Sequence, residues 1–254
     1  MYTPNSVQKA REKMRVAFFS DLHANIHTLT AATKSAYRNG CSRIFVAGDL
    51  VGRGSHPLET LRFLKEQRIP GIRGNVERKL LSLREREQDI LELLKGKKEN
   101  LAWTALQLDE DAWDYMGSLP ERMELQIEGF NILMVHGSPL SDKDYIYPSI
   151  TSYGITTKMN GMKCDLLVCG HSHIPFVKRF RGLRVVNCGS VGMSVDGDPK
   201  PSYAIADLSA EKGIHCRIFR FSYSLSDLLT SLKTREIPGI DEEVYLTGVK
   251  KIKD

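Results

Sequence analysis

The chain has 254 residues, of which 41% are hydrophobic and 26% are charged, a composition typical of a folded globular protein that argues against a disordered or fibrous one. Its 36 basic and 31 acidic residues give a net charge of +5, which suits an anionic substrate; because the basic residues are spread along the chain, nucleic-acid binding is not indicated. No apolar run approaches the roughly 18 residues of a membrane span, so we expect no membrane association.

Residues 1–13 form a polar segment of mixed charge without the apolar stretch of a signal peptide. We interpret them as an extension that the fold can do without, because Met14 stands directly before the first predicted strand. The five cysteines are odd in number and include no Cys-x-x-Cys pair, which indicates reduced thiols. These features predict a cytoplasmic protein with a single domain over residues 14–254.

Strands and helices alternate over the first part of this domain. The predicted elements are a strand at 16–19, a helix from about 26 to 38, a strand at 43–47, a helix from 57 to about 67 and a short strand at 69–73. Asn25 is the expected cap of the first helix, and each strand ends in polar residues. Such alternation predicts a parallel sheet with right-handed crossovers.

The pattern changes twice after this region. Residues 77–120 are helical and highly charged, and we interpret them as a helical insertion beside the functional site that we expect at the strand ends. An ordinary helical layer is the alternative. One apolar face is marked by Leu80, Leu81, Leu83, Ile90, Leu91, Leu93 and Leu94. Beyond residue 120 we expect a hairpin at 123–128 and 131–135, a helix near 150–159, strands at 165–169, 184–186, 203–207 and 214–220, and a helical tail.

Candidate metal ligands follow the predicted strands. They are Asp21, His23, Asp49, Asn75, His136, His171 and His173. Residues two apart on an extended segment point the same way, so Asp21 and His23 could reach one cation. Carboxylates, imidazoles and an amide oxygen are ligands that Mn, Fe, Zn or Ni accept. One ion cannot use all seven side chains, but a pair of ions can if one carboxylate bridges them.

In this order the motifs resemble those of the calcineurin-like metallophosphoesterases. They are Asp21-Leu22-His23, Gly48-Asp49, Gly74-Asn75-Val76-Glu77, His136-Gly137 and Gly170-His171-Ser172-His173, within a resemblance that spans about residues 14–208. The small bacterial and archaeal phosphodiesterase branch of that superfamily is the most similar. Its further features are Gly48-Asp49-Leu50-Val51-Gly52, Leu119-Pro120, Val135-His136-Gly137-Ser138-Pro139 and Asn187-Cys188-Gly189-Ser190-Val191-Gly192.

The resemblance implies an α/β fold, namely a four-layer α/β/β/α sandwich of two mixed sheets with the helical insertion. It also implies two divalent metal ions, with Mn²⁺ favoured and Fe, Zn, Ni or Mg as alternatives. The first would be held by Asp21, His23, Asp49 and His173, and the second by Asp49, Asn75, His136 and His171, so that Asp49 is the bridge. The implied activity is hydrolysis of a small phosphorylated substrate by in-line attack of a metal-bridging hydroxide.

Three positions depart from the family pattern. Val76 stands where many members have a histidine that donates a proton, which favours phosphodiesters or acidic leaving groups as substrates. A phosphomonoesterase or a dinucleoside polyphosphate hydrolase is the alternative, and a catalytically inactive scaffold of the same fold is a more remote one. Cys188 replaces a usual proline and is interpreted as a packing residue, with metal contact as the lesser reading. Arg53 is a candidate phosphate contact, with a solvated surface arginine as the alternative.

Other polar residues near the motifs have several interpretations. His27 and His56 are candidate catalytic residues that could donate a proton or contact phosphate, although capping or a surface position explains each as well. Asn187 is a candidate acceptor for the second ring nitrogen of a ligand histidine. Glu77 is expected to be an acid in the first turn of a helix, favoured by the helix dipole. The oligomeric state is left open.

Overall fold

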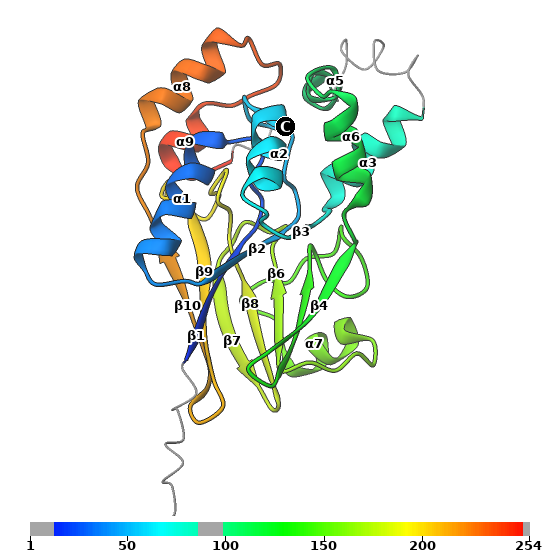
Figure 1. Cartoon of the computed structure of the whole chain (residues 1–254), viewed down its shortest axis with the longest axis vertical. Coiled ribbons are helices and arrows are strands. Elements are labelled where there is room, and N and C mark those ends of the chain that lie inside the picture. Colours follow the sequence, from blue (N-terminus) through cyan, green and yellow to red (C-terminus); the bar gives the residue numbers. More distant parts are fainter. Residues whose placement is uncertain (1–12, 86–98, 251–254) are drawn as a thin grey trace, which may run out of the picture.

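The computed structural model describes residues 13–85 and 99–250, and two five-stranded sheets form its centre (Figure 1). The first sheet has the order β10-β9-β1-β2-β3 and the second β4-β5-β6-β8-β7. In the first, β1 pairs in parallel with β2, which pairs in parallel with β3, while β9 is antiparallel to both β1 and β10. In the second, β5, β6 and β8 are parallel and the outer strands β4 and β7 are antiparallel. Both sheets are therefore mixed, as predicted.

The strand bounds follow the apolar runs of the sequence closely. They are β1 Met14–Phe19, β2 Arg43–Ala47, β3 Gly71–Ile72, β4 Arg122–Ile127, β5 Phe130–Val135, β6 Leu166–Cys169, β7 Phe176–Phe180, β8 Leu183–Asn187, β9 Ser202–Ser209 and β10 Gly213–Arg220. Only β7 was not predicted. It is an edge strand in which Lys178 and the exposed Arg179 interrupt the apolar residues, so it lacks the apolar run that marks the others.

The helices are α1 Ile26–Arg38, α2 Pro57–Glu66, α3 Asn75–Arg84, α5 Glu99–Leu106, α6 Glu110–Ser118, α7 Ser152–Met159, α8 Leu225–Thr234 and α9 Glu243–Thr247. Asn25 caps α1 as expected, because its side chain accepts a hydrogen bond from the backbone N–H of Thr28. Among the described residues, no helix is long and apolar enough to cross a membrane.

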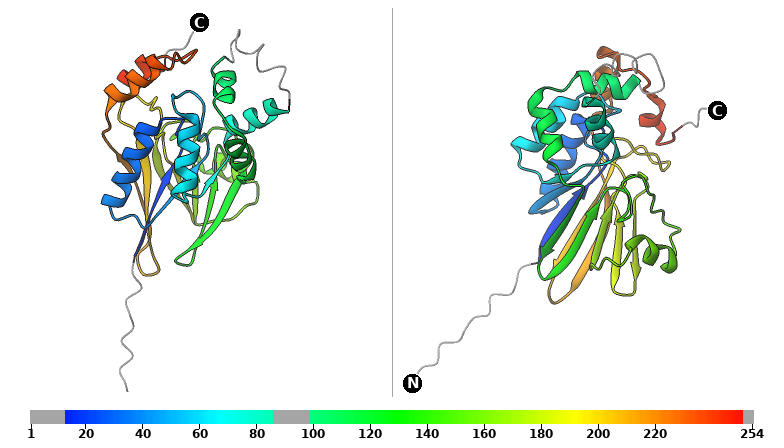
Figure 2. Two further views of the ribbon diagram at one scale, coloured as in Figure 1. Left: turned by 45° about the horizontal axis from the view of Figure 1, so that its top comes forward. Right: turned by 90° about the vertical axis from the view of Figure 1, so that its right-hand side faces the viewer.

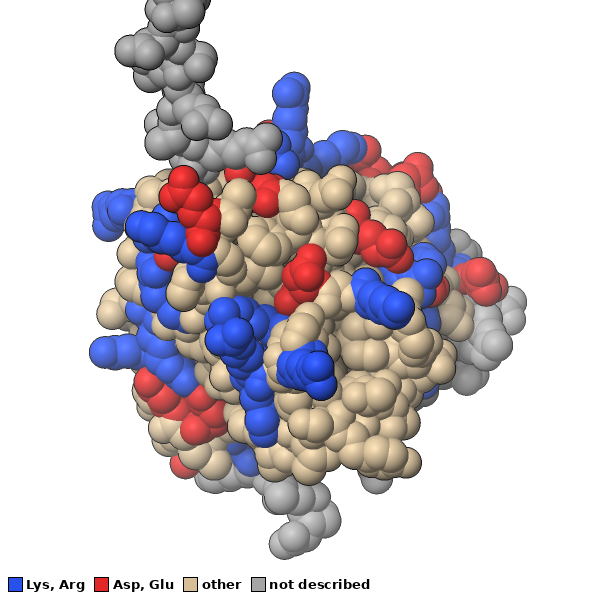
Figure 3. All heavy atoms as spheres, turned by 90° about the horizontal axis from the view of Figure 1, so that it is seen from below, with Lys and Arg blue, Asp and Glu red and all other residues tan. Residues whose placement is uncertain are grey.

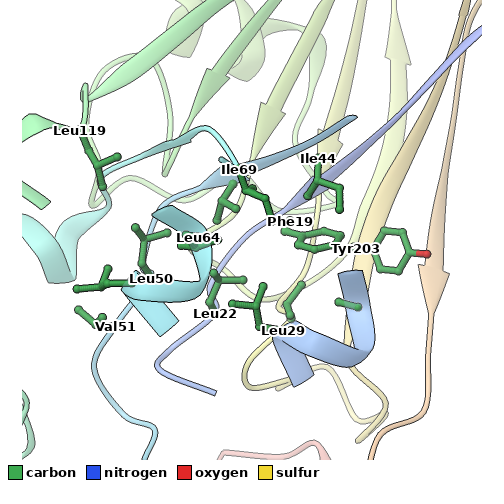
Figure 4. Packing of buried hydrophobic residues seen from close by; sticks show 14 of the residues in the cluster. Phe19, Leu22, Leu29, Ile44, Leu50, Val51, Leu64, Ile69, Leu119 and Tyr203 are labelled. Atoms are coloured by element: carbon green, nitrogen blue, oxygen red, sulfur yellow. The ribbon is translucent and has the colours of Figure 1, made fainter. Parts of the chain in front are cut away.

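Three apolar clusters show that these elements form four layers. Val16 and Phe18 of β1 pack toward the second sheet, whereas Ala17 and Phe19 point to the other face, where α1, α2 and α6 cover the first sheet. There Phe19 meets Tyr203 of β9 edge to face at 5.1 Å (Figure 4). The third cluster joins the outer face of the second sheet to α7, which lies on the opposite side of the molecule from α1 and α2 (Figure 2). The predicted α/β/β/α sandwich is thus confirmed.

The segment interpreted as a helical insertion contributes to the main core. Trp113 and Met116 of α6 share the apolar cluster of α1 and α2, and α6 packs against α2 and α3. This packing agrees with the alternative, in which these helices belong to the helical layer. The apolar positions predicted at 90–94 lie outside the described residues.

The far end of the molecule, where β1 begins, is viewed in Figure 3. Its lysines and arginines form separate groups between acidic residues and uncharged surface.

Candidate metal centre

The seven predicted ligands meet where strands of the two sheets end. Asp21 and His23 follow β1, Asp49 follows β2, and Asn75 begins α3 just after β3. His136 follows β5, and His171 and His173 follow β6. Hydrogen bonds join the two sheets at this point: His136 Nδ1 lies 2.8 Å from the carbonyl oxygen of Ala47, and the backbone N–H of His171 donates to Asp21 Oδ2 at 2.9 Å. The site is therefore built across both sheets.

Six of these residues fall into two compact groups. We call Asp21, His23 and His173 the buried group, and Asp49, His136 and His171 the outer group. In each group one potential ligand atom per residue lies within 4.8 Å of those of the other two. All three residues of the buried group are buried, with His173 the most exposed at 7%, while His171 of the outer group is partly exposed. The outer group is therefore the one that borders the surface.

The Asp49 carboxylate faces both groups. Its Oδ1 lies 3.3 Å from His136 Nε2, and its Oδ2 lies 3.9 Å from His23 Nε2. The side chain is 96% buried, and Oδ1 also accepts a hydrogen bond from the backbone N–H of Val76. This placement matches the bridging position that the resemblance implied.

Asn75 completes the outer group through its amide oxygen. Its Oδ1 lies 3.2 Å from His136 Nε2 and 2.8 Å from His171 Nδ1. The opposite amide orientation would donate hydrogen bonds to both rings, but only the orientation with the oxygen inward provides a ligand. Oxygen and imidazole lone pairs converge here, which is the arrangement that a cation satisfies.

Backbone carbonyls select the tautomers of two histidines. Nδ1 of His136 donates to Ala47, and Nδ1 of His173 donates to the carbonyl oxygen of Met193 at 2.6 Å. Each Nε2 atom thereby faces the cluster, where it can accept once it carries no proton; for His136, whose pKa is raised by Asp49, a bound cation would take the place of that proton. We had expected Asn187 to serve as such an acceptor, and this was wrong: its amide instead donates to the Gly170 carbonyl and the Ser172 hydroxyl. Asn187 fixes the loop that carries the histidines rather than a ring.

Most of the candidate ligands have left-handed backbone conformations. Their φ values are +54° for Asp21, +47° for His23, +52° for Asp49, +63° for His171 and +57° for His173. Non-glycine residues rarely adopt such angles, and where they do so together the strain commonly marks a functional site. The tight turns aim side chains inward from the strand ends, a feature that no sequence pattern had indicated.

Glu77 has a larger role than that of a first-turn acid. Its carboxylate is fully buried and accepts hydrogen bonds from the backbone N–H groups of Asp49, Leu50, Val51 and Gly74 at 2.7–3.1 Å. Burial raises the pKa of Glu77 to about 7 and Asp49 acts in the same direction, while the backbone N–H donors oppose both. The Glu77 side chain thereby fixes the loop of Asp49 relative to the loop of Asn75.

The electrostatics of the cluster favour an added cation. Burial raises the pKa of Asp49, but His136 outweighs it and lowers the net pKa well below the usual range. Conversely, burial lowers the pKa of His136, and Asp49 outweighs it to raise the net value to about 10. Burial and His173 lower the pKa of His23 to about 3, which keeps this ring neutral and able to ligate. Two buried carboxylates thus require nearby positive charge.

An orphaned oxygen tests whether a metal fits the buried group. Asp21 Oδ2 accepts from Ser20 and from the His171 backbone, but Oδ1 is buried without a hydrogen-bond partner, 3.2 Å from His173 Nε2. Because His173 Nδ1 is the donor of that ring, two acceptors face each other. A divalent cation between them would satisfy both, so the residues present fit the metal that the sequence predicted.

His27 and His56 lie side by side outside the cluster. Their ring centroids are 5.2 Å apart, and His27 Nε2 lies 2.9 Å from the Ser231 hydroxyl of α8. Among the described residues their charged neighbours are Asp227, Glu59 and Arg235, none of which is a candidate ligand. The structure thus pairs these histidines with each other, and their catalytic role stays a prediction.

Arg53 lies nearer to the ligands. It is exposed, and its guanidinium is close enough to lower the pKa of His23. The following residue, Gly54, lies against the backbone of His23, where an added Cβ would come within 2.0 Å of the carbonyl oxygen. This contact places the Arg53 loop at the edge of the site.

Cys188 and Val76 are both core residues. Cys188 is fully buried between the two sheets, beside Val186 and Ala204, and lies in neither ligand group, which agrees with a packing role. Val76 is 7% exposed and packs in the cluster of Leu50 and Leu80. The side chain at the position of the usual histidine therefore points into the core.

Comparisons with known proteins agree with this geometry. The family model of the calcineurin-like phosphoesterase superfamily domain matches residues 14–211. An uncharacterised protein of Methanocaldococcus jannaschii is 26% identical over 256 residues, covering 92% of this chain and 98% of the relative. A metallophosphoesterase from Sphaerobacter thermophilus has a crystal structure with a TM-score of 0.77 and 26% identity, covering 94% of this chain and all of that one.

A hypothetical protein from Pyrococcus horikoshii shares the fold at a TM-score of 0.80 and 21% identity, covering 94% of this chain and all of that one. These three proteins come from bacteria and archaea, the group that the motifs favour. On the family match and the ligand geometry together, the chain belongs to the calcineurin-like phosphoesterase superfamily.

Proposed function

We propose that the protein hydrolyses phosphate esters, and phosphodiesters in particular, at a centre of two divalent metal ions. Asp21, His23, Asp49 and His173 would hold one ion, and Asp49, Asn75, His136 and His171 the other. The observation that carries the proposal is the convergence of these side chains in two groups, with Asp49 between them. Mn²⁺ is the ion we propose first, because carboxylate, amide and imidazole ligands suit it.

A pair of divalent cations supplies Lewis acidity toward the phosphoryl oxygens and lowers the pKa of water. The chain itself fixes the ligands beforehand: carbonyl groups orient His136 and His173, and Glu77 orients the loop of Asp49. Ligands that are already ordered do not have to be reorganised during the reaction, which is the main source of electrostatic catalysis. In-line attack by hydroxide then needs only a correctly placed phosphate.

Cations on the chain gather at the mouth of the outer group. Lys79 lies one turn after Asn75 on the same face of α3, with its Nζ 3.1 Å from the Asn75 amide. Burial lowers the pKa of Lys79, and Arg78, Arg53 and Lys143 lower it further while Asp49 opposes them. The effects of these three cations on the pKa of Lys79 indicate that all four positive groups lie near one another. We propose that Lys79 and Arg53 contact the substrate phosphate.

The side chain of Val76 supports the preference for diesters. It is packed in the core and has no proton to give, so a leaving group that departs as a stable anion is favoured. A phosphodiester with an acidic alcohol meets that condition. The substrate we propose is therefore a small diester rather than a phosphoprotein.

A direct experiment tests this function. The purified protein is stripped with a chelator, reloaded separately with Mn²⁺, Fe²⁺, Zn²⁺, Ni²⁺ or Mg²⁺, and assayed with bis(p-nitrophenyl) phosphate and p-nitrophenyl phosphate. We expect two bound metal equivalents by elemental analysis, activity only in the reloaded samples, and faster turnover of the diester. Full turnover after chelation would exclude the mechanism, and no turnover with either ester would favour an inactive scaffold. Preference for the monoester would support the phosphomonoesterase alternative.

A further inference from the structure

Two exposed tyrosines continue outward from the outer group. The ring of Tyr145 stacks on the imidazole of His171, with centroids 4.4 Å apart and planes inclined by 27°. Tyr147 stacks on Tyr145 in turn, at 5.4 Å and only 7°. Tyr145 is thus the ring that stacks with both His171 and Tyr147. The row therefore leads from a candidate ligand to the surface.

Both tyrosine rings are accessible although they are stacked. Tyr145 is 45% exposed and Tyr147 is 42% exposed, while Ile146 between them is fully buried. This alternation anchors the segment through Ile146, which packs in the core with Leu133 and Leu167, and turns both aromatic rings outward. The rings are thus fixed to the body of the protein rather than carried on a loose loop.

A second anchor holds the residue before Tyr145. The Asp144 carboxylate accepts hydrogen bonds from the Ser138 hydroxyl at 2.6 Å, from Lys158 of α7 at 2.5 Å and from the backbone N–H of Tyr145 at 2.9 Å. A stacking surface fixed in this way loses little conformational entropy when it binds a ring. The arrangement is therefore suited to binding rather than only to shielding His171.

The position of Tyr147 favours a ligand over a purely structural role. Tyr147 stacks on Tyr145, which stacks on His171, so Tyr147 is two stacking steps away from the candidate ligand histidine. Lys143, two residues before Tyr145 on the same segment, is close enough to Lys79 to contribute to the lowering of its pKa. Positive charge and aromatic surface thus lie side by side, which is the combination that phosphate and a nucleobase together require.

We propose that Tyr145 and Tyr147 form a subsite that stacks a nucleobase of the substrate, so that the diester contains a nucleoside. Because Tyr147 is two rings away from His171, the bound ring is one carried on a linker such as a sugar, rather than one bonded directly to the reacting phosphate. This inference rests on the proposed function, since it names the substrate class of that site.

The test uses two diesters with the same leaving group, thymidine 5′-monophosphate p-nitrophenyl ester and ethyl p-nitrophenyl phosphate. Because the departing p-nitrophenol is identical, the ratio of their kcat/KM values reports on the retained group. We expect the wild-type protein to prefer the nucleoside ester, and Tyr147→Ala to lower that preference between about 5-fold and 150-fold, the range of base–aromatic stacking. Tyr147→Phe keeps the ring and should keep the preference.

The matched control is Tyr153→Ala, since Tyr153 is a tyrosine of α7 that is 84% exposed and should not change the ratio. A second readout is calorimetric binding of the two products, thymidine 5′-monophosphate and ethyl phosphate, to the purified protein. The nucleotide should bind more tightly, and Tyr147→Ala should remove the difference.

The two proposals fail in different ways. If both diesters are hydrolysed but neither the kcat/KM ratio nor the binding difference depends on Tyr147, the nucleobase subsite is wrong and the phosphoesterase function stands. If neither diester is hydrolysed while the tighter binding of the nucleotide still depends on Tyr147, the subsite stands and the hydrolytic function is wrong.

Discussion

The two ligand groups differ in what surrounds them. The buried group of Asp21, His23 and His173 is enclosed by protein, and its orphaned carboxylate oxygen lies 3.2 Å from the His173 ring nitrogen Nε2. The outer group of Asp49, His136 and His171 meets a lysine and a tyrosine at its partly exposed side. Under the proposed function this contrast suggests a division of labour, in which the buried group would anchor a cation and the outer group would present one to the substrate.

The two groups also differ in the secondary structure that carries their residues. The buried group joins the end of β1, at the centre of the first sheet, to the loop after β6. Asn75, which completes the outer group, begins α3, and the next turn of that helix carries Arg78 and Lys79 toward the surface. A helix that begins at a ligand can place charges at fixed distances from it, which a strand end cannot do. Substrate selectivity is therefore expected from α3 and the tyrosine segment.

The largest effect is expected when the residue that faces both groups is replaced. Asp49→Asn keeps the size of the side chain but removes a negative charge that faces His136 on one side and His23 on the other. We expect kcat/KM for a phosphodiester to fall at least about 100-fold, together with loss of bound metal. Steady-state kinetics and elemental analysis measure the two effects.

The control for that variant is Asp111→Asn, on the exposed surface of α6, where the carboxylate only pairs with Lys65. Retention of two metal equivalents and of wild-type turnover by Asp49→Asn would show that Asp49 does not bridge the groups.

A glycine allows the buried group to be disturbed without touching a ligand. An added Cβ at Gly170 would lie 1.8 Å from the Ser20 hydroxyl oxygen and 2.5 Å from Asp21 Oδ2. Gly170→Ala must therefore displace Asp21, and we expect the free energy of unfolding to fall by about 1–3 kcal/mol. Metal binding should weaken as well. Urea denaturation and metal titration provide the measurements.

Gly117→Ala in α6 is the matched control, because its Cβ would meet only a leucine methyl group at 3.9 Å and alanine favours a helix. Equal stability and metal affinity of the two alanine variants would contradict the close packing assigned to Asp21.

Local sequence patterns predicted the strands and the candidate ligands at their ends. Apolar runs located nearly every strand, and strand ends located all seven ligand candidates, because parallel strands of one sheet must end on the same side. The edge strand β7 was missed because charged outward positions interrupt its apolar pattern. Local patterns thus sufficed for the frame of the site.

Long-range contacts were beyond the reach of these patterns. The hydrogen bonds of Glu77 to the Asp49 loop, 28 positions earlier, leave no periodic signal, and neither do the left-handed turns at His23 and His173. The carbonyl acceptors of His136 and His173 could not be inferred either, since every residue offers a carbonyl group. What the sequence could not predict was the support around the ligands.

A variant of Lys79 tests whether the substrate phosphate binds beside the outer group. Lys79→Ala removes a cation near Asn75 without removing a candidate ligand, so the metals should stay bound. We expect KM for a phosphodiester to rise about tenfold, which corresponds to roughly 1.4 kcal/mol and suits the loss of one charged hydrogen bond. Kinetics at several salt concentrations measure the effect.

Lys65→Ala removes an exposed lysine from α2 and should change KM little. An unchanged KM in Lys79→Ala, with two metal equivalents still bound, would place the phosphate elsewhere and weaken the contrast between the two groups.

The smallest effect is expected from the two histidines outside both groups. A proton donor must carry its proton at the working pH, but burial lowers the pKa of both His27 and His56 below the ordinary value, so both rings are mainly neutral at pH 7. We therefore expect His27→Ala and His56→Ala to change kcat less than about threefold, the margin set by indirect packing effects. A pH–rate profile is the decisive measurement. A donor with a lowered pKa would limit activity on the alkaline side, because its active, protonated form is lost as the pH rises through that pKa. If either alanine variant removes this alkaline fall in the rate, that histidine is a catalytic residue as the sequence predicted. The substrate must then reach beyond the outer group toward α8.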